Sequence, residues 1–246
     1  MLWNPSGKVE PIKTDKIKCL PNLVTAKLCD NEPIPLFLLS MALSLSIKMT
    51  WPRCVPVPIF YNLTQLELFS NLMGKTWPKK WNWIVEMLQH TPKLQHLIIH
   101  EEIENGNDDV DEDIWENPKI VPECLSSNLK TCLFKNYRGK KCELQFVDYV
   151  MRSSKVLSSM TIHCACSTNL NAKYQMLQKL SLCLRGCIFE RFRGILHEGE
   201  IDKRVQFLIE GLFAIIKAIF QDQVCVTVSS TIQLVTFLPV QFHRTQ

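Results

Sequence analysis

The chain has 246 residues, of which 46% are apolar and 21% charged, a composition typical of a globular protein with a substantial core. Its net charge of +4 is too small to indicate a particular class of partner. The most apolar run, residues 207–220, contains Glu210 and Lys217 and is shorter than the roughly 20 apolar residues of a membrane span. We therefore expect a buried helix there and no membrane anchor.

Acidic residues are concentrated in one segment. Nine of the 24 acidic residues, and no Lys or Arg, lie between Glu101 and Glu116, so the rest of the chain carries 28 basic residues against 15 acidic ones. We expect a solvated acidic loop at 101–116 on a basic body. Such a body can attract an acidic partner by electrostatic steering, although solvated surface charge is the plainer interpretation.

The eleven cysteines are interpreted through the redox compartment. No basic segment followed by an apolar stretch opens the chain, so the pattern of a secretory signal peptide is missing. Without export, disulfides are not expected, and cysteine behaves as a small buried hydrophobe. The sequence therefore predicts an intracellular protein of the cytoplasm or nucleus.

An internal repeat organises the chain. Leu63, Leu66, Leu68 and Asn71 form the L-x-x-L-x-L-x-x-N signature of a leucine-rich repeat, in which Leu66 and Leu68 point from one strand into the core. Degenerate copies begin at Leu23, Ala42, Leu94, Leu129 and Leu157. Successive copies are 19, 21, 31, 35 and 28 residues apart, against about 20–29 for typical units. Each copy predicts a strand.

A second self-similarity joins a helix pattern to the strand that follows it. Residues 81–100 align without a gap on residues 144–163, so that Trp81 corresponds to Leu144, Leu94 to Leu157 and His100 to His163. The helical spacing and the strand alternation recur together in both segments. Each segment is therefore predicted to form a helix followed by a parallel strand, joined by a right-handed crossover.

The first of these units is rich in Trp and Lys. Thr76 suits a helix N-cap and Pro78 the first turn, while Pro92 ends the helix. An interleaving of Lys and Trp also occurs in platforms that stack nucleic-acid bases. The packing interpretation is preferred because one helical face carries an apolar stripe, which places Trp81 in the core and leaves Trp83 half exposed. The stripe consists of Trp81, Ile84, Val85 and Leu88.

Further elements follow from the same patterns. Helices are expected near 144–152, 172–182 and 203–220, and the alternating Val224, Val226 and Val228 predict a strand. Residues 1–15 and 191–202 are expected to form a loop or linker. The sequence thus predicts an α/β fold, a curved solenoid like that of leucine-rich-repeat proteins, with parallel strands on one face and helices on the other.

The alternation of side chains along the strands defines a candidate binding surface. Side chains that point away from the helices line the open face of the sheet. We expect this face, together with Trp83 on a helix, to contact a partner protein. The residues of the face are Lys27, Ser46, Glu67, His96, Ile98, His100, Leu133 and Thr161.

No motif for catalysis or cofactor binding occurs. The sequence lacks a Gly-x-Ser-x-Gly elbow, a glycine-rich phosphate loop and a His-Glu-x-x-His motif. Cys164, Cys166, Cys183 and Cys187 do not follow a standard zinc-finger spacing. The acidic run 109–120 has Ile114 where a calcium-binding loop needs Gly. We expect neither enzymatic activity nor a cofactor or metal.

Residues 115–162 resemble the FBD domain found in plant F-box/leucine-rich-repeat proteins. The likeness continues to about residue 187, and the segments 55–68 and 87–100 look like the leucine-rich repeats that precede the domain in that family. The residues that carry the match are Trp115, Pro118, Val121–Leu125, Leu129, Lys130, Tyr137, Gly139, Glu143, Leu144, Phe146, Leu157, Met160 and Ile162.

The resemblance implies a division into four parts: an extension (1–16), degenerate repeats (17–114), an FBD domain (115–190) and a C-terminal linker, helix and strand-like tail (191–246). It also implies a non-catalytic protein–protein interaction module that selects the target of an SCF ubiquitin ligase. In that family an F-box docks on a Skp-type adaptor. No F-box pattern precedes the repeats here, so we do not expect adaptor docking.

Two other functions are compatible with the sequence. The chain can be a non-functional gene fragment, because its tail at 228–243 looks like a segment that normally precedes the repeats. It can also be a basic nucleic-acid-binding repeat protein, for which the basic body and Lys79–Trp81 are weak evidence.

Overall fold

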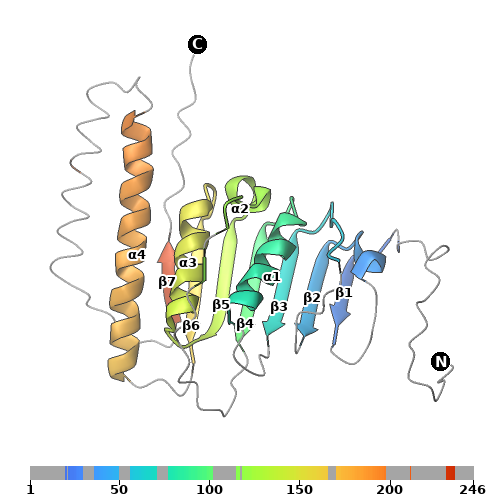
Figure 1. Ribbon diagram of the computed structural model, residues 1–246, viewed down its shortest axis with the longest axis horizontal. Helices are drawn as coiled ribbons and strands as arrows, with labels where there is room; N and C mark the ends of the chain where they lie inside the picture. The colour runs from blue at the N-terminus through green and yellow to red at the C-terminus, as the bar shows by residue number, and fades with distance from the viewer. Residues whose placement is uncertain are drawn as a thin grey trace.

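A single sheet of seven strands forms the framework (Figure 1). The computed structural model describes residue 20, residues 22–29, 36–49, 56–70, 77–101, 115–116, 118–165, 170–197, residue 211 and residues 231–235. The strands are β1 (Thr25–Leu28), β2 (Ser44–Met49), β3 (Gln65–Ser70), β4 (His96–Glu101), β5 (Thr131–Tyr137), β6 (Ser159–Cys164) and β7 (Thr231–Val235).

Strand order in space follows strand order in the chain. Strands β1 to β6 are parallel, and β7 lies antiparallel beside β6. The register places Thr25 beside Ser44 and then, in turn, Gln65, His96, Thr131 and Ser159. These positions are separated by the same 19, 21, 31, 35 and 28 residues as the repeats in the sequence. The prediction of an α/β repeat with parallel strands is therefore confirmed.

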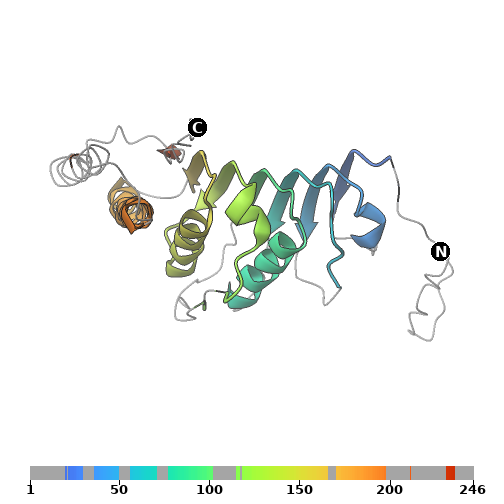
Figure 2. The same ribbon diagram turned by 90° about the horizontal axis from the view of Figure 1, so that it is seen from above.

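The helices lie on one side of the sheet, as Figure 2 shows from above. A 3₁₀ helix, η2 (Leu36–Leu39), joins β1 to β2, and α1 (Trp77–Gln89) joins β3 to β4. The short α2 (Glu123–Ser127) precedes β5, α3 (Lys141–Ser153) joins β5 to β6, and α4 (Leu170–His197) follows β6. Helices therefore shield one face of β3 to β6, while none of the described helices lies on the other face.

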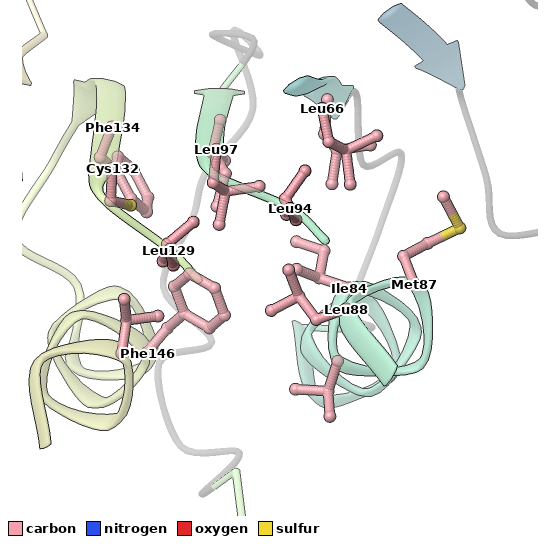
Figure 3. Close-up of a cluster of buried hydrophobic side chains, with 14 of the residues drawn as sticks. Leu66, Ile84, Met87, Leu88, Leu94, Leu97, Leu129, Cys132, Phe134 and Phe146 are labelled. Carbon is pink, nitrogen blue, oxygen red and sulfur yellow. The ribbon is translucent and has the colours of Figure 1, made fainter. Parts of the chain in front are cut away.

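Between the helices and the sheet lies the core. Two rows of inward-pointing strand residues run across it, with exposed fractions of 0–2% from β2 to β6. Figure 3 shows Leu66, Leu97, Cys132 and Phe134 of these rows facing side chains of α1 and Phe146 of α3. The rows are Ala26, Leu45, Leu66, Leu97, Cys132 and Met160, and Leu28, Ile47, Leu68, Ile99, Phe134 and Ile162.

Aromatic side chains fill the core around α1 and α3. Trp81 is fully buried, as predicted, and stacks on Phe146 with ring centroids 4.3 Å apart. Trp115 packs edge-on against Tyr149 at 5.3 Å, and its indole N–H donates to Asn82 Oδ1 at 2.9 Å. The α1 stripe predicted from the sequence is buried throughout, and the helix ends at Gln89, before Pro92.

Two predictions about the sequence segments are corrected. Glu101 does not belong to a solvated loop, because it is the last residue of β4 and shares the inward-pointing parity of Leu97 and Ile99; it is only 4% exposed. Residues 191–197 are not a linker, because α4 continues to His197. The segment 170–197 contains no proline, and a glycine such as Gly194 costs a helix only about 1 kcal/mol.

Two of the predicted helices are present, and several other predicted elements lie outside the described residues. The helix expected at 144–152 is α3, and that at 172–182 is part of α4. The tail contributes β7 at Thr231–Val235. Several expected features lie outside the described residues: the loop at 1–15, Asn71, Thr76, the acidic segment 102–114, the strand at 224–228 and, apart from the helical Gly211, the helix at 203–220.

Candidate functional site

The helix-free face of the sheet, here called the open face, consists of three rows of side chains. Strand alternation sends every second residue of β1 to β6 to this side. The first row is Thr25, Ser44, Gln65, His96, Thr131 and Ser159; the second is Lys27, Ser46, Glu67, Ile98, Leu133 and Thr161; the third is Lys48, Phe69, His100, Lys135 and His163. The structure therefore places all eight strand residues singled out in the sequence on one surface.

Hydrogen bonds between neighbouring strands order part of this surface. His96 Nδ1 lies 2.9 Å from Thr131 Oγ1, and His100 Nε2 lies 2.8 Å from Glu67 Oε1. The ring of Phe69 stacks on His100 with centroids 4.0 Å apart. These contacts hold side chains of β3, β4 and β5 in fixed positions, so that a partner would meet a preorganised surface.

Ile98 and Leu133 form the apolar centre of the open face. The register places them side by side on β4 and β5, and each is half-buried. Neither belongs to the core cluster between the sheet and the helices. This pair gives the otherwise largely polar face a small apolar centre, although partly exposed aliphatic residues are common on protein surfaces.

Trp83 lies elsewhere. It is on α1, which covers the opposite face of the sheet, and its side chain packs partly against the core. The helix and the strand residues expected to contact a partner are therefore not brought together. Any contact through Trp83 would require a second surface.

Four members of the third row, Lys48, Phe69, Lys135 and His163, were not singled out in the sequence. Each follows a second-row residue by two positions, so strand alternation alone indicates them. The regular alternation of β5 ends at Lys135, because the pairing of β5 with β6 shifts between Lys135 and Tyr137. Asn136 is the extra residue there; it has a φ of 61°, and its side-chain amide donates to the Glu101 carbonyl oxygen at 2.7 Å.

Lys80 and Trp81 do not form a nucleic-acid platform. Lys80 is 3% exposed, makes an ion pair with Glu101 and holds its ammonium 4.5 Å from the Trp81 ring centroid. Burial lowers the pKa of Lys80 to about 7, while the nearby Glu143 carboxylate acts in the opposite sense. Both side chains are therefore parts of the core and do not reach a backbone phosphate.

Glu143 is the second buried acid near Lys80. It is fully buried, and one carboxyl oxygen accepts the backbone N–H groups of Arg138 and Lys140 at 3.0 and 3.1 Å. Burial raises the pKa of this carboxyl, although both hydrogen bonds and Lys80 favour its ionised form. The group thus organises the turn into α3, which is a structural role.

The described part of the chain offers no metal site and no membrane-crossing helix. No cluster of three or more His, Cys, Asp or Glu side chains suited to a metal ion occurs among the described residues. None of the described helices is long and apolar enough to cross a membrane. Burial raises the pKa of the Cys124 and Cys132 thiols to about 12, so these thiols are protonated and inert near neutral pH.

Several residues of the FBD likeness have structural explanations. Gly139 has a φ of +78°, and a Cβ there would lie 2.6 Å from Met176 Cγ of α4. Phe146 supports Trp81, and Trp115 supports Tyr149. The FBD segment begins at residue 115, between β4 and β5. These two strands pair in parallel like their neighbours, so the FBD segment adds further units to the sheet of the repeats.

Comparison with known proteins agrees with this architecture. The FBD family model matches residues 116–162. A putative FBD-associated F-box protein of Arabidopsis thaliana is 31% identical over 157 residues, which cover 59% of this chain and 34% of that protein. Two F-box/FBD/LRR-repeat proteins of the same plant are 33% identical over 141 residues (56% of this chain, 32% of theirs) and 31% identical over 191 residues (72% and 42%).

These matches leave much of the relatives uncovered. The chain spans 32–42% of the length of the three relatives. No solved structure matches the chain significantly. The family model and the sequence relatives nevertheless show that the chain contains an FBD domain and is homologous to the FBD-associated F-box and F-box/FBD/LRR-repeat proteins of Arabidopsis thaliana.

Proposed function

We propose that the chain is a non-catalytic interaction module that binds a target protein through the open face of its sheet. The observation that carries this proposal is the alignment of side chains from six strands, in three rows, on a face that no described helix covers. The homologous F-box/FBD/LRR-repeat proteins support a role in protein interaction. The resemblance to that family implies that this region selects the target.

The physical argument is the contrast between the two faces. The inner face is filled by side chains of 0–2% exposure from β2 to β6, whereas the open face keeps half-buried apolar and polar groups in fixed positions. A parallel repeat sheet presents such a surface as a rigid array, which reduces the entropy lost on binding. We further propose that the protein acts inside the cell and selects a target for ubiquitination.

A matched pair of charge reversals tests the face. Glu67→Lys together with Ile98→Asp changes the second row, whereas Glu86→Lys changes an exposed residue of α1 on the opposite side. A partner identified by mass spectrometry from plant extract, then purified, is expected to bind the wild type and Glu86→Lys equally. We expect the double variant to bind at least about tenfold more weakly, a loss of about 1.4 kcal/mol. Equal binding by all three proteins would refute the proposal.

A further inference from the structure

The open face is basic. Its rows carry three lysines, Lys27, Lys48 and Lys135, and three histidines, His96, His100 and His163. Glu67 is the one acid among these rows, and its carboxylate is hydrogen-bonded to His100. Within the described part of the chain the face therefore offers lysine ammonium groups and imidazole N–H donors to a partner, and Glu67 as its one acid.

Lys135 and His163 stand out within the third row. The register places them side by side on β5 and β6, and both are half-buried. Neither makes an ion pair with any other residue that the structure describes. A half-buried ammonium group near apolar surface, such as that of Lys135, binds a carboxylate more strongly than a fully solvated one, because water screens the pair less. The ring N–H of His163 can donate a hydrogen bond to the same carboxylate.

The apolar centre lies two residues from Lys135 along β5. Leu133 precedes Lys135 on β5, and its neighbour on β4 is Ile98. Side chains two positions apart on a strand are about 7 Å apart. An extended peptide repeats its own side chains at the same spacing, so an aliphatic and an acidic residue at positions i and i+2 match Leu133 and Lys135.

We infer that the open face recognises an extended, acidic protein segment in which an aliphatic side chain contacts Ile98 and Leu133 and a carboxylate two positions away contacts Lys135 and His163. The inference deepens the proposed function and rests on it. Charge complementarity selects the acidic partner, and the apolar centre favours a peptide over a nucleic acid. The Trp81 ring of the Lys–Trp segment is buried between the sheet and the helices, so it is not available for base stacking.

The probe is a synthetic peptide labelled with fluorescein. A peptide that matches Leu133 and Lys135 at i and i+2 runs along the strands, where β4 has six residues and β5 has seven, so a peptide of about ten residues covers the face. The first peptide contains Leu and Glu at i and i+2 within an acidic sequence. The second replaces each Leu by Ser, the third replaces each Glu by Lys, and a single-stranded oligonucleotide of similar length serves as the fourth probe.

Fluorescence anisotropy with the whole chain measures each affinity at low and at physiological salt. We expect the first peptide to bind at least about tenfold more tightly than each of the other probes, with weaker binding at higher salt. Tighter binding of the oligonucleotide would overturn the inference in favour of nucleic acid. Equal affinity for the acidic and the basic peptide would also overturn it.

Matched variants locate the site. Lys135→Glu is expected to weaken the first peptide about tenfold or more, whereas Lys155→Glu, an equal charge change at an exposed residue before β6, is expected to change its affinity less than about twofold. Leu133→Ser should reduce the preference for Leu over Ser in the peptide. Circular dichroism and unfolding curves of each variant identify a loss that comes from misfolding. Equal losses for Lys135→Glu and Lys155→Glu in folded proteins would refute the site.

The two proposals fail in different ways. If the purified partner is lost from the Glu67→Lys, Ile98→Asp variant but binds Lys135→Glu as tightly as the wild type, the open face binds a partner that is not recognised by acidity. Only the inference about the acidic segment is then overturned. If the partner binds all face variants equally, the proposed function itself is overturned.

Discussion

The two halves of the sheet are built differently. Between β1 and β3 the copies are 19 and 21 residues apart, the one described connecting helix is the single 3₁₀ turn η2, and the inner rows are aliphatic. Between β3 and β6 the copies are 28–35 residues apart, and α1, α2 and α3 cover the sheet. The aromatic residues Trp81, Trp115, Phe134, Phe146 and Tyr149 fill the wider layer there.

The difference shows what added chain length does in a repeat. A step of about 20 residues leaves room for a strand, a turn and little more, whereas a longer step allows an α-helix of several turns. A helix packs farther from the sheet than an extended connection, and large rings fill the intervening space. Several FBD residues, such as Trp115 and Phe146, therefore fill the interior of the longer repeats, and we expect stability to be concentrated in this half.

Removal of the central aromatic ring gives the largest expected effect. Trp81→Ala deletes the ring that stacks on Phe146 and faces Phe134, which leaves a cavity in the longer repeats. We expect the free energy of unfolding to fall by about 4 kcal/mol, measured by urea denaturation. Trp83→Ala, on the same helix but only partly buried, should cost about 1 kcal/mol. Comparable losses at the two positions would contradict the concentration of stability around Trp81.

Substitutions at two leucines of the same inner row test whether the edge of the sheet contributes less stability than its interior. Leu68 on β3 is 2% exposed and has strands on both sides, whereas Leu28 on the edge strand β1 is 8% exposed. We expect Leu68→Ala to lower the free energy of unfolding by about 3 kcal/mol and Leu28→Ala by about 1 kcal/mol, because an edge strand opens locally at lower cost. Hydrogen exchange of the β1 and β3 amides checks the same gradient. A larger loss at Leu28 would reverse it.

The buried charges of the longer repeats predict a pH effect with a defined sign. Burial lowers the Lys80 pKa to about 7, so from about pH 7 the unfolded chain binds more protons at this site and stability rises with pH. Glu143 opposes this trend, because its raised pKa makes the folded state bind more protons as pH passes above the unfolded value of 4.5. Above about pH 9 the buried thiols, with raised pKa values, also oppose it.

A Glu143→Gln background isolates the contribution of Lys80. In that background the free energy of unfolding is expected to rise by about 1.4 kcal/mol per pH unit between pH 7 and 8.5, where one proton separates the two states. Adding Lys80→Met should remove this slope. Denaturant unfolding at several pH values measures both proteins. An unchanged slope after Lys80→Met would show that another group titrates.

The smallest expected effect concerns the irregularity at the end of β5. Asn136 has a positive φ and donates to the Glu101 carbonyl oxygen. Asn136→Ala loses the hydrogen bond and strains the backbone, for an expected cost of about 2 kcal/mol, whereas Asn136→Gly loses only the bond, about 1 kcal/mol. Urea denaturation measures the free energy of unfolding of both variants. An equal loss for Asn136→Ala and Asn136→Gly would show that backbone strain does not contribute.

Much of the fold was predictable because the repeat signal is local. Leu66 and Leu68 alternate within one strand, and the α1 stripe repeats at helical spacing, so each element is visible in a short window. The positions of Lys27, Ser46 and Glu67 on the open face follow from the same alternation. The burial of Glu101 was not predicted, because its neighbours in the chain are acidic while its strand parity directs it inward to Lys80.

The sequence by itself determined the number and order of the parallel strands, their register and the buried position of Trp81, because these depend on periodicities that the chain carries locally. Only the tertiary structure decided that Lys80 pairs with Glu101 and lies near the charge of Glu143, and that Trp83 lies on the opposite side of the sheet from Ile98. These contacts join residues that are far apart in the chain, and their geometry arises only when the repeats stack.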